Sequence, residues 1–167
     1  KDDLKIVSGN ITVNAVNDAI RGRDSIAIQT GTFTLKSGGD GLQSNNDEDP
    51  EKGYISIVGG TFNISATNDG IQAETRLEVG GGSFNITTGG GSANGSHAGQ
   101  GDWGNTRPGN TSTTASDTPS AKALKAGVDV TITGGVFIID SADDGFHSNA
   151  SLTVNGGEFT ITSGDDG

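Results

Sequence analysis

The chain contains no cysteine, no methionine, three prolines and only ten basic residues. The absence of cysteine excludes a disulfide scaffold and a thiol enzyme, and it is compatible with a secreted bacterial protein. No apolar run approaches the roughly 18 residues that span a bilayer, so we expect no membrane insertion. The formal net charge of −11 argues against nucleic acid as a partner and favours metal cations.

Large apolar residues are also scarce, but they are arranged periodically. Leu, Ile, Val and Phe make up 35 of the 167 residues, a fraction close to that of disordered chains. When the chain is aligned on its aromatic residues, five apolar columns recur with a spacing of 22 residues, interrupted by two insertions, and they absorb 29 of the 35. This regularity predicts a stack of repeats with a shared core.

Each repeat contains two apolar pairs at positions i and i+2, the period of a strand with one buried face, followed by one further apolar position. The aromatic column consists of Ile11, Phe33, Phe62, Phe84, Phe137 and Phe159. The glycine column two residues before it consists of Gly9, Gly31, Gly60, Gly82, Gly135 and Gly157. We therefore predict an all-β fold, a right-handed parallel β-helix of about six coils of 22 residues with three short strands per coil.

The repeat also predicts the domain organisation. We expect one domain over residues 1–167, with insertions at 45–54 and at about 89–119. The first insertion is acidic and the second is rich in Gly, Ser, Asn and Thr, which favours solvated loops. The second also carries the only tryptophan, Trp103, which would be available to stack on a sugar. Because the sequence stops inside a repeat, we expect a piece of a longer chain whose C-terminus is cut in mid-coil.

Seven residues after the aromatic column, an aspartate recurs in five of the six copies. These aspartates and their acidic or amide neighbours are Asp18, Asp40, Asp69, Asp144 and Asp166, with Asn17, Asn68, Asp143 and Asp165. One interpretation is a turn, since Asn-Asp-Gly sequences favour turns. However, coils about 4.8 Å apart would bring the carboxylates together, where two charges repel by about 3–4 kcal/mol at an effective dielectric near 20. Oxygen-only ligands in such a row predict several bound calcium ions.

The fourth copy has Lys122 where the aspartate would stand, and its ammonium is predicted to act as a fixed counter-ion to Asp69 and Asp144 in the coils on either side. A second polar column follows the last apolar position and is basic or hydrogen-bonding in every coil that has it. It consists of Arg21, Gln43, Gln72, Lys125 and His147. These residues are either ordinary exposed strand residues or a surface along which an acidic sugar chain binds. We take Arg21, Lys122, Lys125, His147 and Trp103 as the candidate carbohydrate-binding residues.

Three segments carry a resemblance to a known family. They are "GGTFNISATNDGIQAE" at 59–74, "GGVFIIDSADDGFHSN" at 134–149 and "SAKALKAGVDVTITGG" at 120–135. Together they resemble a bacterial family of β-helical carbohydrate-binding domains, whose clostridial members bind acidic plant polysaccharide and cellulose. The resemblance covers essentially the whole chain. It implies a topology similar to that of pectate lyases, calcium at the aspartate turns and a non-catalytic role at the cell surface.

The function that we expect is calcium-dependent binding of an acidic polysaccharide such as polygalacturonate, with the protein secreted by a bacterium and located extracellularly or at its surface. A polysaccharide lyase is the enzymatic alternative, with Arg21, Lys122 or Lys125 as the base. No paired-base pattern singles out one of them, so we predict no enzymatic activity. The structural alternative is an adhesin or a filament, because open coil ends favour end-to-end self-association.

Overall fold

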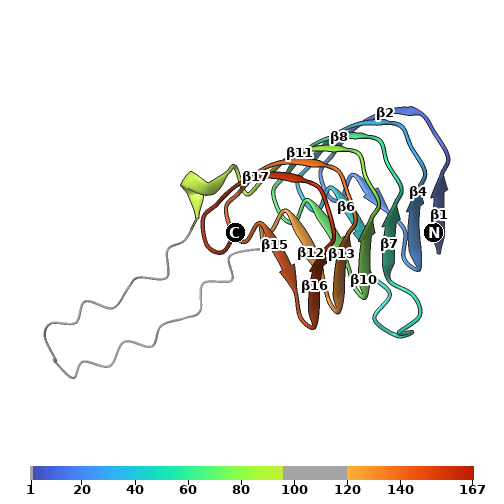
Figure 1. Cartoon of the computed structure of the whole chain (residues 1–167). Helices are drawn as coiled ribbons and strands as arrows, with labels where there is room; N and C mark the ends of the chain where they lie inside the picture. Colours follow the sequence, from blue (N-terminus) through green and yellow to red (C-terminus); the bar gives the residue numbers. More distant parts are fainter. Residues whose placement is uncertain (1, 96–119) are drawn as a thin grey trace, which may run out of the picture.

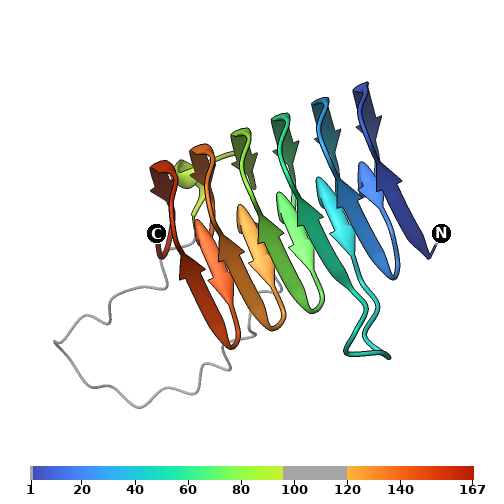
Figure 2. The ribbon, with the colours of Figure 1, turned by 45° about the vertical axis from the view of Figure 1, so that its right-hand side comes forward.

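The computed structural model describes residues 2–95 and 120–167, and almost all of its regular structure is strand. The strands are grouped into three parallel sheets, which we call A, B and C in the order in which the chain visits them. Successive coils lie side by side from the N-terminal to the C-terminal end (Figures 1 and 2). The parallel β-helix predicted from the repeat is confirmed.

The strand bounds follow the apolar columns. Sheet A contains β1 (Asp3–Ile6), β4 (Ser25–Ile28), β7 (Tyr54–Ile57), β10 (Arg76–Val79), β13 (Asp129–Ile132) and β16 (Ser151–Val154). Sheet B contains β2 (Asn10–Ala15), β5 (Thr32–Ser37), β8 (Thr61–Ala66), β11 (Ser83–Thr88), β14 (Val136–Ser141) and β17 (Glu158–Ser163). Sheet C contains β3 (Ile20–Arg21), β6 (Leu42–Ser44), β9 (Ile71–Ala73), β12 (Leu124–Ala126) and β15 (Phe146–Ser148). A short 3₁₀ helix, η1 (Ser92–Asn94), follows β11.

The aromatic column forms the centre of the core. Phe33, Phe62, Phe84 and Phe137 are fully buried or nearly so, and Phe159 continues the stack at the last coil. Adjacent rings are parallel with centroids 4.6–5.0 Å apart, which matches the spacing of the coils. The predicted ladder is therefore present, and it fixes the register of sheet B.

The glycine column allows the chain to turn sharply between sheets A and B. Gly31, Gly60, Gly82, Gly135 and Gly157 all have positive φ between 116° and 139°. A Cβ at Gly31 would lie 2.8 Å from the carbonyl oxygen of Gly9 and 3.0 Å from the ring of Phe33. Glycine is required there both by backbone conformation and by the space that the aromatic ladder leaves.

The first insertion leaves the β-helix between β6 and β7. The predicted insertion, 45–54, extends one residue too far, because Tyr54 is the first residue of β7 and pairs with Ser25. Asn46, which is 3% exposed, anchors the loop by donating from Nδ2 to Oδ1 of Asp24 at 2.6 Å. The ammonium of Lys52 lies 2.9 Å from the other oxygen of Asp24. The loop is therefore held against the β-helix by side chains of its own.

Strand β11 ends at Thr88, where the segment expected to be the second insertion follows. The amide of Ser92 donates to Oδ1 of Asp140 at 2.7 Å and fixes the first part of the insertion to the neighbouring coil. Residues 96–119, including Trp103, lie outside the described residues. Within residues 2–95 and 120–167, no helix has the length and apolar character needed to cross a membrane.

Candidate functional site: the aspartate edge

The predicted aspartates lie on the turns that lead from sheet B to sheet C, one turn per coil. We call this surface the aspartate edge and define it by Asp18, Asp40, Asp69, Lys122, Asp143, Asp144, Asp165 and Asp166. Asp40, Asp69 and Asp144 are buried, with 5%, 2% and 8% exposure, whereas Asp165 and Asp166 are exposed. The stacking of equivalent turns in register, on which the sequence argument depends, is thus present.

One oxygen of each stacked aspartate connects its coil to the next. The amide of Asp40 donates to Oδ1 of Asp18 at 2.9 Å, and the amide of Asp69 donates to Oδ1 of Asp40 at 3.0 Å. Lys122 continues the series, since its amide donates to Oδ1 of Asp69 at 2.9 Å. The carboxylates therefore take the place of backbone acceptors where the sheets are interrupted by the turn.

The second oxygen of each aspartate faces the neighbouring polar column. Oδ2 of Asp40 accepts a hydrogen bond from Nε2 of Gln43 at 2.6 Å, and Oδ2 of Asp69 lies 3.0 Å from the ammonium of Lys125. The pairs at the two ends are Asp18 with Arg21, at 3.7 Å, and Asp144 with His147, at 3.1 Å. In the described part of the chain, the predicted aspartate ligands and the polar column that follows them thus lie side by side on one surface.

Lys122 is a counter-ion to Asp144, as the sequence predicts, but its second partner is Asp143 rather than Asp69, whose Oδ2 lies beside the ammonium of Lys125 instead. Its ammonium lies 2.6 Å from Oδ2 of Asp143 and 2.8 Å from Oδ2 of Asp144, and its side chain is 14% exposed. Burial alone would lower the pKa of Lys122, but the hydrogen bonds that its ammonium donates to Asp143 and Asp144, together with the charges of these carboxylates, outweigh burial and raise it. Burial likewise acts to raise the pKa of Asp144, and the hydrogen bond and charge of Lys122 reverse that effect, so the net pKa is lowered.

Asp40 occupies the same position in the repeat but lacks such a counter-ion. Among the described residues its side-chain partners are an amide, that of Gln43, and the backbone of Asp69. Burial, with the charges of Asp69 and Asp18 added, raises the pKa of Asp40 to about 6. A carboxylate held in this way is stabilised by any cation that approaches it.

The three carboxylates of Asp143, Asp144 and Asp165 come closest to a metal site. One oxygen from each lies within 4.8 Å of the others, and this is the one such group of acidic or histidine side chains within residues 2–95 and 120–167. An all-oxygen donor set of this charge fits calcium. Because the ammonium of Lys122 contacts two of the three carboxylates, an ion bound there has to share them with it.

The other predicted ligands have structural contacts but no such grouping. The backbone carbonyl of Asn17 accepts a hydrogen bond from the backbone amide of Gly39 at 3.2 Å. The backbone amide of Asn68 donates to the backbone carbonyl of Gly39 at 3.1 Å. The amide of Asp166 lies 3.4 Å from Oδ1 of Asp144. Calcium binding by Asp18, Asp40, Asp69, Asp166, Asn17 and Asn68 stays a prediction.

The predicted carbohydrate-binding residues are partly engaged within the protein. Lys125 and His147 lie against Asp69 and Asp144, and Nε2 of His147 is also 3.1 Å from Oδ1 of Asn149. Among the four of these residues that the structure describes, Arg21 has the most exposed side chain, with 55% of it accessible, and its Nε donates to Oδ1 of Asn45 at 3.4 Å. Sequence reasoning missed the pairing of the two columns, although the polar column starts only three residues after each aspartate.

A family model described as that of carbohydrate-binding domain-containing proteins matches residues 1–167, and the chain belongs to this family. Searches of curated proteins and of solved structures found no match. The family supports a carbohydrate-binding role and a carbohydrate partner.

Proposed function

We propose that the protein is a calcium-dependent, non-catalytic module that binds an acidic plant polysaccharide, such as polygalacturonate, at the surface of the bacterium that secretes it. The observation that carries this proposal is the grouping of Asp143, Asp144 and Asp165 on a carbohydrate-binding protein. Calcium at such a group supplies positive charge and open coordination positions for sugar carboxylates.

The charge of the aspartate edge supports a requirement for cations. The edge carries seven carboxylates, whereas Lys122, Lys125 and Arg21 supply three permanent positive charges beside them. Without further cations, the edge would repel a polyanion such as polygalacturonate. We therefore expect binding of this polymer to depend on calcium, with Arg21 adding a direct contact to uronate groups.

The contacts of the basic residues favour binding over lyase chemistry. A lyase base must be neutral before it removes a proton, but the carboxylates around Lys122 raise its pKa above the ordinary value for lysine. The ammonium of Lys125 lies 3.0 Å from Oδ2 of Asp69 and is paired with that carboxylate. Both lysines are therefore better suited to neutralising the edge than to catalysis.

Affinity electrophoresis through gels that contain polygalacturonate tests the proposal. We expect wild-type protein to be retarded with millimolar calcium and to migrate freely with a chelator. Asp165→Asn should weaken the retardation, while Glu158→Gln, which removes one exposed charge from sheet B, should not. Equal retardation with calcium and with chelator would contradict the calcium bridge, and release of unsaturated sugar, measured by ultraviolet absorbance, would contradict the non-catalytic role.

A further inference from the structure

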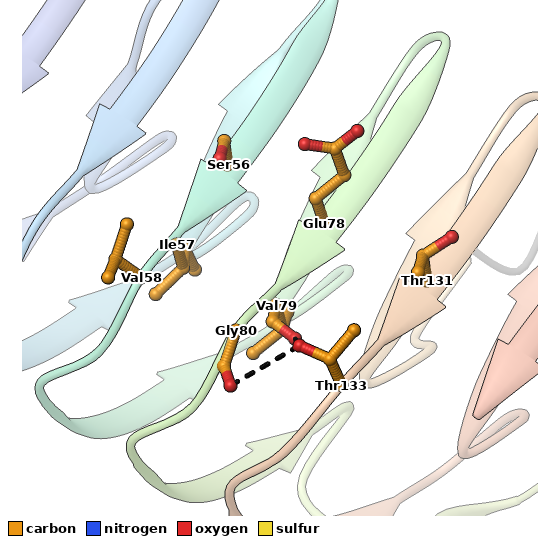
Figure 3. A pocket seen from close by; sticks show the side chains of 8 residues that line it. All are labelled: Ser56, Ile57, Val58, Glu78, Val79, Gly80, Thr131 and Thr133. Carbon is orange, nitrogen blue, oxygen red and sulfur yellow. Dashed lines mark hydrogen bonds between the residues drawn. The ribbon is translucent and has the colours of Figure 1, made fainter. Parts of the chain in front are cut away.

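The outer surface of sheet A is hollowed at the ends of its strands, away from the aspartate edge. One hollow of about 260 Å³ lies across β7, β10 and β13 (Figure 3). A second, of about 270 Å³, lies across β1, β4 and β7. Ser56 and Val58 line both hollows, so the two lie next to each other along the axis of the β-helix, and we call them together the groove.

A glycine opens the hollow that lies across β7, β10 and β13. Val58, Gly80 and Thr133 are equivalent residues of three successive coils, each directly after its strand in sheet A. Gly80 carries no side chain between the isopropyl group of Val58 and the hydroxyl of Thr133, as Figure 3 shows. Its backbone conformation does not require glycine, because φ is not in the positive range. An added Cβ would lie 3.2 Å from the backbone oxygen of Val58, a tight contact that a shift of a few tenths of an ångström relieves. The open space at Gly80, which we call the notch, therefore results from the absence of a side chain in this coil.

The lining of the groove suits a sugar. Val58 is 64% exposed and offers an apolar surface to the C–H face of a sugar ring. Ser56, Thr131 and Thr133 place hydroxyl groups around the notch, and Glu78 adds a carboxylate that accepts hydrogen bonds from sugar hydroxyls. An apolar contact combined with a few converging polar groups is the usual composition of a small-ligand site.

The charges of the groove select the kind of sugar. Glu78 is the charged residue of the hollow around Gly80, and Nε of Arg76 lies 3.6 Å from its Oε1. Lys5 lines the far end of the second hollow. With one acidic and one basic side chain in its lining, the groove is close to neutral, and a uronate placed over the notch would meet the carboxylate of Glu78. This lining favours a neutral glycan over an acidic one.

We propose that this groove binds a single neutral glycan chain, lying along the axis of the β-helix, without calcium. The groove crosses five neighbouring strands, from β1 to β13, which at the usual strand spacing is a length of about 20 Å. The inference rests on the carbohydrate-binding part of the proposed function, and it is independent of calcium and of the acidic ligand.

The test uses the whole chain in chelator, with cellohexaose, xylohexaose and mannohexaose as neutral probes, followed by amide NMR and calorimetry. We expect at least one of them to bind and to shift the amide signals of Gly80, Thr131 and Thr133. Gly80→Thr, which introduces the residue that the next coil has at this position, should weaken binding about tenfold or more by filling the notch. Thr131→Val keeps the shape of the side chain, removes one hydroxyl and should weaken binding about fivefold.

Thr153→Val is the matched control, because Thr153 pairs with Thr131 in the next coil but does not line the groove. It should bind as wild type does. The proposal is overturned if none of the three probes binds in chelator, if Gly80→Thr and Thr131→Val both bind normally, or if the shifted amides lie on the aspartate edge. Retention of Gly80→Thr by polygalacturonate gels with calcium is expected. If Gly80→Thr is no longer retained, the two polymers share one site and the proposal of a separate groove is overturned. If wild-type protein binds a neutral probe but is not retained by polygalacturonate, only the proposed function is contradicted.

Discussion

Asp40 and Asp144 occupy the same position in two coils, yet their surroundings shift their pKa values in opposite directions. Both are almost fully buried, and each accepts or faces a backbone amide of the following coil. Burial raises the pKa of Asp40 to about 6. Burial also acts to raise the pKa of Asp144, but the ammonium of Lys122 has the larger, opposite effect, so the pKa of Asp144 is lowered. The comparison teaches that the repeat fixes the position of a carboxylate, while one neighbouring side chain decides whether its charge is stabilised.

The difference also divides the aspartate edge into two parts with different side-chain contacts. Around Lys122 the protein supplies its own cation, and around Asp40 the described residues supply an amide instead. Every buried side-chain nitrogen and oxygen in the described part of the chain has a hydrogen-bond partner, so it is charge rather than hydrogen bonding that is left uncompensated. External cations are the means of compensation that we propose.

The largest expected effect comes from removing the internal cation. Lys122→Met leaves Asp143 and Asp144 without their ammonium, and we expect the free energy of unfolding in chelator to fall by about 2–4 kcal/mol, since the pair is largely but not fully buried. Urea denaturation measures this loss. Millimolar calcium should restore more stability to the variant than it adds to wild type, because the three carboxylates become free to hold an ion.

Lys36→Met is the control for the same change of residue at an exposed position of β5, and we expect it to alter stability by less than about 0.5 kcal/mol. A similar loss in both variants would show that the ammonium of Lys122 has no special role. If calcium does not restore stability to Lys122→Met, then calcium does not replace the ammonium of Lys122, and the proposed metal site at these carboxylates is contradicted.

Neutralising Asp40 should raise the free energy of unfolding, in contrast to the loss expected for Lys122→Met. In chelator at pH 7, Asp40→Asn removes a buried charge while keeping an oxygen for the amide of Asp69, and we expect a gain of about 2 kcal/mol in the free energy of unfolding. Asp144→Asn, the matched change, loses its interaction with Lys122 and should destabilise. Thermal and urea denaturation measure the change in the free energy of unfolding of each variant. If both variants are destabilised equally, the proposed difference between Asp40 and Asp144 is contradicted.

The pH dependence follows from the same raised pKa. The folded protein holds a proton on Asp40 more tightly than the unfolded chain does, because the pKa is about 6 rather than 3.8. The stabilisation from this proton is present at pH below about 4 and is lost as the pH rises through about 6. Between pH 4 and 7 in chelator, the stability of wild type relative to Asp40→Asn should therefore fall with rising pH, and a constant difference would contradict the raised pKa.

The smallest expected effect is at Arg21. Its guanidinium is 3.7 Å from Asp18 and its side chain is 55% exposed, so Arg21→Gln should change stability by less than about 1 kcal/mol. Retardation in polygalacturonate gels should nevertheless decrease, because an exposed positive charge is removed from the proposed binding surface. Unchanged retardation would remove Arg21 from that surface.

The sequence predicted the fold almost completely because the repeat is strict. Residues that form a column, such as Phe62 and Phe84, are paired in neighbouring strands as the spacing of 22 requires. The one adjusted boundary is at Tyr54, which looks like part of the acidic insertion in sequence but pairs with Ser25 in sheet A. Local composition misassigned this residue, and sheet pairing determines its place.

The candidate site was predicted in position but not in its internal contacts. Periodicity placed the aspartates together, and the interruption at Lys122 correctly indicated a counter-ion to Asp144. The predicted pairing of Lys122 with Asp69 is wrong, because the ammonium of Lys125 lies beside Asp69 instead. Periodicity did not show that one oxygen of Asp18 or Asp40 accepts an amide from the next coil, because this depends on the side-chain rotamer at the turn. The groove beside Gly80 was also missed, since a single missing side chain leaves no periodic signal.

The most direct test of the cation requirement is a crystal structure of the whole chain grown with millimolar calcium, with the ions identified by anomalous scattering. We predict an ion about 2.3–2.6 Å from oxygens of Asp143, Asp144 and Asp165, with the ammonium of Lys122 retained on one side or displaced by the ion. Well-ordered carboxylates at this group and beside Asp40, with no calcium bound to either, would contradict the account.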